Sequence, residues 1–406
     1  MNEETRESLL RRIGPGLITA AVVIGPGSIV ASSRAGAEGE YRLVWMMLVG
    51  FILMATFTAM GARLACAIPE TPLQYITKRW GRALAFITGL SGFLVTAGFQ
   101  FGNNIGAAAS LSTITDTPDW FWALLFTALA LFFLIRAQHV YKLLEMAMII
   151  LVFVMLGAFL LNLLWTGLSV TGVISGLVPR AFEGNEPTIA RAMLATTFSA
   201  VAAFYMAYLG HEKGWTRKNA ERAIGDSWIG ISFLAVIALI ILINAAESLY
   251  GTGRDFANIG ELATQLQAVL GPWATAIFSI GLAAASFSSF IANAVIGGAL
   301  MADGLGQYGG ISSRPVKAWT AGVMIIGCGV AITTMLMGRG DTTSLLIAQA
   351  ATLIAAPLCA VLLFGLTSSR RIMGDLRNPV VMIIVGVAGL AIVGWLNLET
   401  LIGFFR

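Results

Sequence analysis

The sequence predicts an all-α polytopic membrane protein, and three observations lead to this fold class. Of the 406 residues, 57% are hydrophobic and only 11% are charged, whereas a soluble domain carries about 25% charged residues. Several apolar stretches exceed ~20 residues, the length of helix that crosses a bilayer core of roughly 30 Å. Alternation of apolar and polar residues with period two is absent, which argues against a transmembrane β-barrel.

The apolar stretches predict eleven membrane-spanning helices in one transmembrane domain over residues 1–406. The polar segments between them are too short to form a separate soluble domain, and the polar N-terminus does not resemble a cleaved signal peptide. The expected spans lie near residues 13–35, 41–66, 83–112, 119–137, 141–166, 189–211, 226–249, 271–302, 315–337, 342–367 and 379–403.

The cationic residues predict the orientation of these spans. If the N-terminus is cytoplasmic, 18 of the 25 Lys and Arg residues fall on the cytoplasmic side. Because loops rich in Lys and Arg remain inside the cell, we expect the N-terminus in the cytoplasm and the C-terminus outside. The expected location is the cell (inner) membrane, where the lipid bilayer surrounds the chain.

Two of the predicted spans contain interruptions. The first span carries IGPGSIV at residues 24–30, and the sixth carries SAVAAFYMAYLGHEKG at residues 199–214. If residues 13–166 and 189–367 are two repeats of five helices, these interruptions occupy matching positions in repeats of opposite topology, with 379–403 as an extra helix. Such paired breaks favour a transporter with its site at the membrane midplane, although Gly and Pro also occur at simple kinks and packing contacts.

Other functional classes have little support in the sequence. A glycine-rich phosphate loop followed by Lys-Ser or Lys-Thr is absent, which argues against an ATP-driven pump. The chain has two histidines, and its three cysteines are irregularly spaced, so neither a metal knuckle nor a disulfide framework nor a cofactor is expected. With no nucleophile next to a base inside the membrane, we do not expect an enzyme. The net charge of +4 comes from loop residues, so nucleic acid is not an expected partner.

The order of short motifs resembles the Nramp family of divalent-metal transporters over nearly the whole chain. The first span opens with GPGL at residues 14–17, and GPGS follows eleven residues later at 25–28, where the family has Asp-Pro-Gly-Asn. The resemblance implies a LeuT-type fold: two inverted five-helix repeats plus an eleventh helix, with helices 1 and 6 broken at the midplane. Further blocks that resemble the family lie at 105–111, 141–153, 176–179, 270–289 and 345–375.

The resemblance also implies positions for the family's metal ligands, and here the residue types differ. The family's metal-binding aspartate falls on Gly25 and its asparagine falls on Ser28. Its Ala-x-x-Met in the sixth span falls on Val201 and Phe204. Of its two glutamines in the tenth span, the first resembles Gln349. The metal itself is left unassigned.

The family's proton path is altered in the same way. Its acidic pair in the third span falls on Gln100 and Asn103, and the proline and histidine of its sixth span fall on Tyr205 and Met206. A proton relay needs titratable side chains in series, and these four positions hold no carboxylate or imidazole. We therefore expect transport that is not coupled to protons.

Two classes of substrate remain open at this point. A divalent ion without a carboxylate ligand must keep much of its water, as Mg²⁺ prefers to do. Alternatively, the exposed N-terminus of the half-helix that follows Gly25 attracts a small anion or an amino-acid-like solute. The expected substrate-binding residues are Gly25, Pro26, Gly27, Ser28, Val201, Phe204, Tyr205 and Gln349, and the expected pathway residues are Gln100, Asn103 and Met206.

Overall fold

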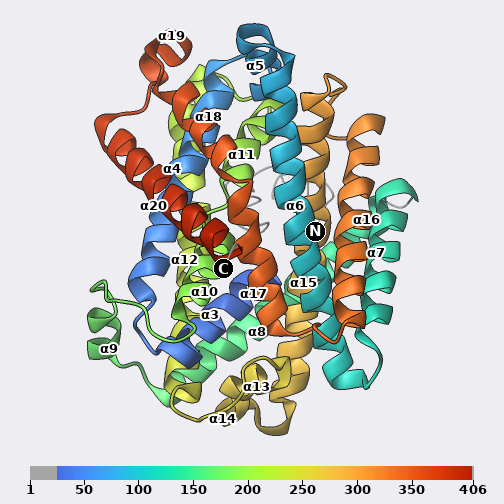
Figure 1. Cartoon of the computed structure of the whole chain (residues 1–406), viewed down its shortest axis with the longest axis vertical. Helices are drawn as coiled ribbons and strands as arrows, with labels where there is room; N and C mark the ends of the chain where they lie inside the picture. The colour runs from blue at the N-terminus through green and yellow to red at the C-terminus, as the bar shows by residue number, and fades with distance from the viewer. Residues whose placement is uncertain (1–24, 137, 405–406) are drawn as a thin grey trace, which may run out of the picture.

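The computed structural model describes residues 25–136 and 138–404, and within these residues every regular element is a helix (Figure 1). The first half of the first predicted span, including the GPGL motif at 14–17, lies outside the described residues. The helices run mostly along the long axis of the molecule and pack side by side as a bundle (Figure 1).

Between Gly25 and Ser175, the described residues form seven helices. They are α3 (Pro26–Gly39), α4 (Val44–Ala67), α5 (Pro72–Trp80), α6 (Arg82–Thr115), α7 (Asp119–Arg136), α8 (Gln138–Thr166) and α9 (Val170–Ser175).

The rest of the described chain contains the second interruption and the last helix. Its α-helices are α10 (Glu186–Thr197), α11 (Ala200–Glu212), α12 (Ala220–Leu249), α13 (Ile259–Ala263), α14 (Gln267–Leu270), α15 (Ala274–Gly304), α16 (Arg314–Leu336), α17 (Thr342–Ala351), α18 (Pro357–Ser368), α19 (Arg370–Met373) and α20 (Val380–Phe404). Its 3-10 turns are η1 (Arg217–Asn219), η2 (Thr264–Leu266), η3 (Gly271–Trp273), η4 (Thr352–Ile354) and η5 (Gly374–Leu376).

Among the described residues, eight stretches are long and apolar enough to cross a bilayer. The fourth predicted span appears as a shorter apolar helix, Asp119–Ile135. The tenth, predicted over 342–367, is divided into α17, η4 and α18, with Pro357 opening α18. Proline suits the first turn of a helix but lacks the N–H that a continuous helix would need, which explains the division.

Helices α6 and α15 form the central pair of the bundle, and small residues allow their close approach. A Cβ atom placed on Gly89 of α6 would lie 2.5 Å from the backbone oxygen of Leu300 on α15. Gly297, on the same face of α15, would meet the side chain of Val323 on α16 at 2.9 Å. Close helix packing through small residues is typical of membrane proteins.

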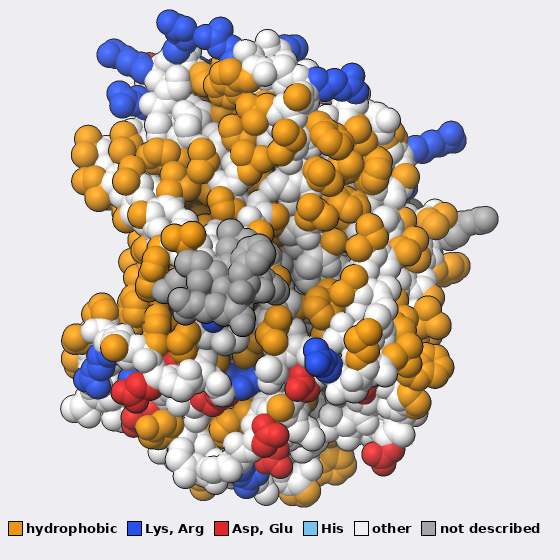
Figure 2. Space-filling view, viewed as in Figure 1, with side chains coloured by type: hydrophobic (Ala, Val, Ile, Leu, Met, Phe, Trp, Pro, Cys, Tyr) orange, Lys and Arg blue, Asp and Glu red, His pale blue; other side chains and the backbone are white. Residues whose placement is uncertain are grey.

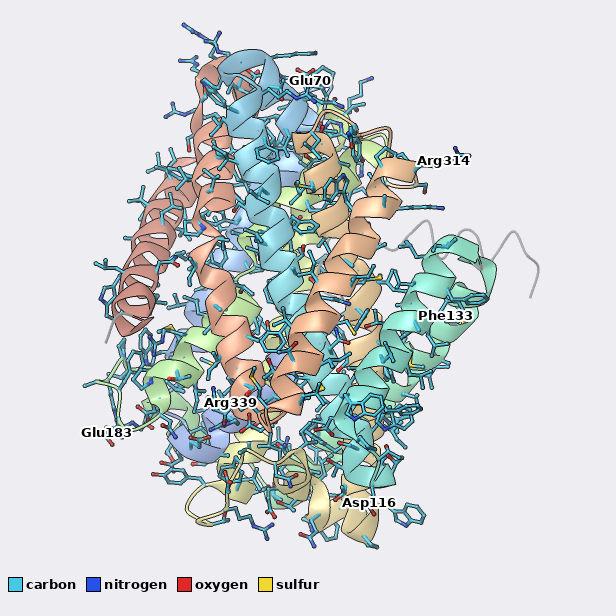
Figure 3. All side chains as sticks on the ribbon, turned by 45° about the vertical axis from the view of Figure 1, so that its right-hand side comes forward. Glu70, Asp116, Phe133, Glu183, Arg314 and Arg339 are labelled. Atoms are coloured by element: carbon cyan, nitrogen blue, oxygen red, sulfur yellow. The ribbon has the colours of Figure 1, made fainter. Side chains whose placement is uncertain are left out.

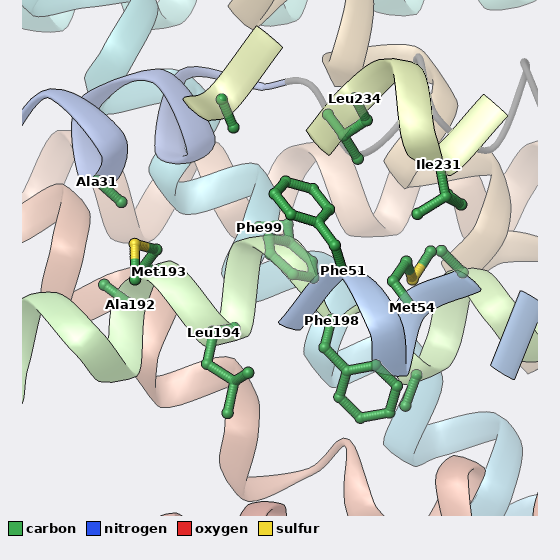
Figure 4. Packing of buried hydrophobic residues seen from close by; sticks show 14 of the residues in the cluster. Ala31, Phe51, Met54, Phe99, Ala192, Met193, Leu194, Phe198, Ile231 and Leu234 are labelled. Carbon is green, nitrogen blue, oxygen red and sulfur yellow. The ribbon is translucent and has the colours of Figure 1, made fainter. Parts of the chain in front are cut away.

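Large apolar side chains fill the space beside this central pair (Figure 4). Phe198, at the end of α10, is buried and meets Phe57 of α4 edge to face, with ring centroids 4.9 Å apart. Phe51, Met193 and Phe99 lie in the same buried cluster. Aromatic packing of this kind fixes the end of α10 against α4.

Lys and Arg gather at one end of the molecule, Asp and Glu gather with some Lys and Arg at the other, and hydrophobic side chains cover the middle (Figure 2). We call the end with α5 and α19 the basic end (Figure 1); it contains Arg79 of α5, Arg371 of α19 and Arg314, which is labelled in Figure 3. The opposite end, with α9 and α13, is called the acidic end and contains Asp116 and Glu183 (Figure 3). This pattern fits a bundle whose middle lies in lipid.

Candidate functional site

The first helix interruption brings a helix N-terminus into the interior. Helix α3 begins at Pro26, with Gly25 as an extended N-cap at φ −116° and ψ −178°. The Gly25 carbonyl accepts hydrogen bonds from the N–H groups of Ser28 at 3.1 Å and Ile29 at 3.3 Å. Because first-turn N–H groups lack partners inside the helix and Pro26 has none, the Gly27 amide is the first that this terminus offers.

The second interruption separates α10 from α11 at Phe198 and Ser199. Ser199 is the N-cap of α11, and its hydroxyl oxygen accepts a hydrogen bond from the N–H of Ala202 at 3.3 Å. Serine favours this position because its side chain satisfies an otherwise unpaired amide. The break therefore falls at the first residue of the stretch 199–214, two residues before Val201 and five before Phe204, which the resemblance had placed at the site.

A small cavity lies where these two breaks approach each other. It offers about 20 Å³ to the centre of a water molecule, and a single buried water requires about 10–15 Å³ by the same measure. The cavity therefore has room for one or two water-sized groups. Its lining comes from α3, α6, α10, α15 and α17 and from the N-caps of α3 and α11, through Gly25, Gly27, Ser28, Phe99, Asn103, Thr196, Ser199, Asn293 and Gln349.

Gln349 of α17 lies between two glycines. A Cβ atom on Gly27 would lie 2.7 Å from the side-chain carbonyl carbon of Gln349, and one on Gly102 would overlap with its Nε2. The side chain is 1% exposed, and its Oε1 has no hydrogen-bond partner among the described residues. A buried acceptor without a donor is costly, so this oxygen is poised for a ligand.

The other polar groups of the cavity are also neutral. Asn103 donates a long hydrogen bond of 3.4 Å from Nδ2 to Gln100 Oε1. Thr196 donates from its hydroxyl to the Met193 carbonyl at 3.1 Å. Asn293, 7% exposed on α15, supplies a third carboxamide. Among the described residues, the lining thus combines carboxamides, hydroxyls, a phenyl ring and a helix N-terminus and includes no charged side chain.

Gly25 faces side chains of two neighbouring helices. A Cβ atom at this position would lie 3.1 Å from Ser289 Oγ on α15 and 3.5 Å from Asn103 Oδ1 on α6. Both distances are at or near the limit of ordinary contact, so a larger side chain would require its neighbours to shift. The lack of a side chain at Gly25 allows α3 to approach α6 and α15 more closely than a carboxylate at this position would permit.

The structure brings together part of the set expected from the sequence. Gly25, Gly27, Ser28, Asn103 and Gln349 all line the cavity. They come from three helices separated widely along the chain, so their convergence is a property of the fold.

The remaining expected residues lie elsewhere. Pro26 packs against Gly106 of α6, and Gln100 packs against Gly327 of α16, where a Cβ atom would lie 2.6 Å from Gln100 Cβ. The sixth-span positions Val201, Phe204, Tyr205 and Met206 are buried along α11 and are not part of the cavity lining. These positions were expected at the break in the sixth span, but the structure places that break at Phe198 and Ser199, before all four of them.

Four cavity residues were missed by the sequence analysis: Phe99, Thr196, Ser199 and Asn293. Ser199 carried a usable signal, because serine before an apolar helical stretch is a typical N-cap. Asn293 lies in the apolar stretch 284–299, which the small residues favour as a packing face. A lone carboxamide in such a helix is the signal that could have marked it.

Beyond the cavity, α3 is joined to α17 by a buried arginine. Arg34 is 7% exposed; its Nε donates to Glu38 Oε1 at 2.5 Å, and its Nη1 donates to Thr343 Oγ1 at 2.9 Å. Charge-assisted hydrogen bonds of this kind are among the stronger ones in proteins. The contact holds α3 against α17 near the acidic end of the molecule. It thereby helps to keep Gly27 close to Gln349.

A second hollow of about 190 Å³ opens at the acidic end beside this contact. It contains three glutamates, and each has a partner. Glu38 pairs with Arg34, while Glu183 and Glu186 pair with Arg42. The hydrogen bond from Arg42 lowers the pKa of Glu183. Within the described residues, no group of three or more His, Cys, Asp or Glu is arranged to hold a metal ion, so these carboxylates form a paired surface network.

Comparison with known proteins identifies the family. A family model described as "Natural resistance-associated macrophage protein-like" matches residues 16–403, nearly the whole chain. The chain belongs to the Nramp family. This confirms the family that the motif order indicated, although residues 25–28 read GPGS instead of the family's Asp-Pro-Gly-Asn.

Curated relatives align over almost the whole Nramp chain. "Divalent metal cation transporter MntH" of Deinococcus radiodurans is 24% identical, over 97% of this chain and 91% of its own. The protein of the same name from Bacillus subtilis is also 24% identical, over 98% of this chain and 93% of its own. The relatives are membrane transporters, which confirms the expectation of a multi-pass transport protein that is not an enzyme.

Solved structures confirm the LeuT-type fold. An Eremococcus coleocola manganese transporter superposes with a TM-score of 0.80 at 20% identity, covering 98% of this chain and 88% of that one. Two more distant transporters also match. Mhp1, a nucleobase-cation symporter, has a TM-score of 0.59 at 14% identity and covers 95% and 92% of the two chains. MhsT, solved with L-phenylalanine, has a TM-score of 0.62 at 15% identity and covers 95% and 98%.

Proposed function

We propose that this Nramp-family chain is a secondary transporter that moves a divalent cation through the cavity by alternating access, as a partly hydrated, Mg²⁺-like ion. The observation that carries the proposal is the set of three carboxamide side chains, from Asn103, Asn293 and Gln349, that line one small cavity. Hard cations prefer oxygen ligands, and Mg²⁺ keeps several of its waters when it binds. The curated relatives named as divalent metal cation transporters support the cation class.

Mn²⁺ and Fe²⁺ fit this lining less well. Their sites gain affinity from charged or polarizable donors, and the described part of the cavity lining contains neither a carboxylate nor a thioether. A bare divalent ion among neutral groups would have a very large desolvation cost. A water shell spreads the charge and lowers that cost, so we expect the ion to be recognised mainly through its waters.

The size of the cavity implies a conformational step. About 20 Å³ of space holds one or two waters, whereas an ion with several waters needs much more room. The structure therefore corresponds, in this proposal, to a state closed around the site. Opening at the break between α10 and α11, or between α3 and α17, would admit the ion.

We further propose that transport is not coupled to protons. The third-span positions hold Gln100 and Asn103, and neither side chain titrates. Within the part of the chain that the structure describes, the residues lining the cavity include no titratable side chain. Protons therefore have no series of acceptors on α6 along which to move.

A small anion or an amino-acid-like solute is the second candidate, favoured by the N-terminus of α3. The Gly27 amide and the partial positive charge of the 14-residue helix face the cavity without a carboxylate to neutralise them. The Gln349 side chain, through its amide group, could complete a carboxylate site. The two candidates thus differ in the charge that faces the cavity: positive for the metal ion, and negative for the anion or the carboxylate of an amino acid.

Uptake by purified protein in liposomes separates the candidates. One panel contains Mg²⁺, Mn²⁺ and Co²⁺, and the other contains small anions and amino acids, with internal pH monitored throughout. We expect saturable Mg²⁺ uptake without acidification of the lumen, reduced at least 10-fold by Asn293→Ala. Gln267→Ala serves as a control, because Gln267 is exposed on α14, away from the cavity lining.

Three results would contradict this reading. Uptake of an amino acid or anion without Mg²⁺ uptake would select the second candidate. Saturable Mn²⁺ binding in the micromolar range would show that the cavity retains soft-metal coordination. Acidification in step with Mg²⁺ entry would refute the absence of proton coupling.

We also propose that the basic end faces the cytoplasm, with the N-terminus inside and the C-terminus outside. The gathering of Lys and Arg at that end supports this orientation (Figure 2), because positively charged loops are retained inside the cell.

A further inference from the structure

A buried carboxylate lies at the basic end, outside the cavity. Asp303 occupies the last turn of α15 and is 1% exposed. Its Oδ2 accepts hydrogen bonds from the hydroxyl of Thr71 at 2.5 Å and from the hydroxyl of Tyr208 at 2.6 Å. Thr71 is the N-cap of α5 and Tyr208 belongs to α11, so one carboxylate joins three helices.

Stability alone does not account for an acidic residue at this position. Asp303 forms no ion pair within the described residues, and its Oδ1 is buried without a hydrogen-bond partner there. It also lies at the C-terminal end of α15, where the helix dipole disfavours negative charge. A neutral side chain of the same shape would be less costly to bury. Ionisable residues inside membrane proteins tend to be functional.

The partner Tyr208 is fixed in an aromatic group at the far end of α11. Its ring stacks on Tyr205 with centroids 5.7 Å apart and meets the ring of Tyr308 edge to face at 5.4 Å. The Tyr308 hydroxyl donates to Glu212 Oε1 at 3.2 Å. Burial, together with nearby Glu212, raises the pKa of Tyr308, so its hydroxyl stays protonated and can donate.

Helix α11 connects this group to the cavity. Its N-cap Ser199 lines the cavity, and the break at Phe198 frees the helix from direct continuation of α10. A helix of 13 residues is about 20 Å long at ~1.5 Å per residue. Movement of Tyr208 at one end is therefore transmitted to Ser199 at the other.

We propose that Asp303 is a positioning residue for transport: its carboxylate clasps α11 to α5 and α15 and keeps the cavity closed toward the basic end. Release of Tyr208 and Thr71 lets α11 move and opens that side. The inference rests on the proposed use of the cavity for transport, but not on the identity of the substrate.

Accessibility of the cavity tests the clasp without any substrate. A cysteine is introduced at Ser199 in the full-length protein after replacement of Cys66, Cys328 and Cys359. The reconstituted protein is treated with a membrane-impermeant thiol reagent from each side separately. We expect Asp303→Ala, which removes the acceptor of both hydrogen bonds, and Tyr208→Phe to raise the labelling rate at least 10-fold from the side of the basic end, with little change from the other side. Asp375→Ala, at an exposed acidic residue of the same end, should leave the rate unchanged.

The alternatives give different results. Labelling of the Asp303→Ala protein at the unmodified rate would overturn the proposal. An equal increase from both sides would also overturn it, because general loosening predicts no preferred side. If Asp303→Ala does not fold, Tyr208→Phe and Thr71→Val decide the question, since each removes one donor and leaves the carboxylate. Absence of Mg²⁺ uptake together with one-sided labelling would refute the substrate but leave the clasp in place.

Discussion

At the scale of single residues, the cavity depends on the glycines that face Gln349. Gly27 and Gly102 come from α3 and α6, and neither position has room for a Cβ atom beside the Gln349 side chain. The Gln349 side chain therefore reaches the cavity from between two backbones, and its Oε1 has no hydrogen-bond partner among the described residues. Glycine is required here for close approach, since neither residue has a positive φ.

Replacing Gly102 by Ala should interfere with Gln349 directly. We expect at least a 10-fold loss of uptake and a loss of about 1–3 kcal/mol in the free energy of unfolding, the usual cost of overpacking. Combining it with Gln349→Ser should recover most of the stability but not the uptake. Thermal unfolding in detergent and liposome uptake measure the two effects. Gly157→Ala is the matched control, because no atom lies within 4 Å of its added Cβ; an equal loss there would contradict the explanation.

The missing carboxylate gives a second prediction at this scale. Gly25→Asp with Ser28→Asn should raise Mn²⁺ affinity at least 10-fold in calorimetry, because a charged oxygen then faces the cavity. Adding Ser289→Ala should strengthen the effect, since Ser289 Oγ lies 3.1 Å from the new Cβ atom. Unchanged Mn²⁺ binding in the triple variant would mean that the cavity does not accept a metal ion.

At the scale of the elements, the two breaks are stabilised by different means. Helix α3 starts without a side-chain cap, with Gly25 and Pro26 defining its first turn. Helix α11 starts with the Ser199 hydroxyl as its cap. Arg34 then fixes α3 to α17 at the acidic end, while Asp303 fixes α11 to α15 at the basic end. The two helices that begin at the breaks, α3 and α11, are thus held at opposite ends of the molecule.

Removal of the Ser199 cap should weaken α11 locally. Ser199→Ala should lower the free energy of unfolding by about 1 kcal/mol, the typical cost of a lost N-cap, whereas Ser199→Asn should retain most of it. Thermal unfolding of the two variants side by side provides the comparison. Equal stability of both would show that packing of α11, rather than its cap, determines the position of the break.

At the scale of the whole molecule, the charge separation predicts the orientation. A reporter that is active only outside the cytoplasm should be active when fused after Arg406, and one that is active only in the cytoplasm should be inactive there. The physical reason is the retention of Lys and Arg at the basic end on the cytoplasmic side. The opposite pattern of reporter activity would reverse the proposed orientation.

The sequence predicted the fold better than the site. Apolar length and the order of motifs indicated the helices and the family, because each helix leaves its own local pattern. The two repeats, 13–166 and 189–367, stay a prediction. Within the site, short motifs placed Gly25, Ser28 and Gln349. The sixth span offers few such motifs, and Val201 and Phe204 lie inside α11 rather than at the break that precedes it.

The amino-acid sequence alone indicates an Nramp-family membrane protein and predicts neutral residues where the family has its metal ligands. Both conclusions depend on local features of the chain, namely the length of apolar stretches and short motifs of neighbouring residues. The packing of the helices, by contrast, brings Thr196, Ser199 and Asn293 together with Gln349 around one cavity. It also joins α11 to α5 through Asp303. Those contacts join helices distant along the chain, and their geometry depends on where each helix breaks and on which glycines allow close approach.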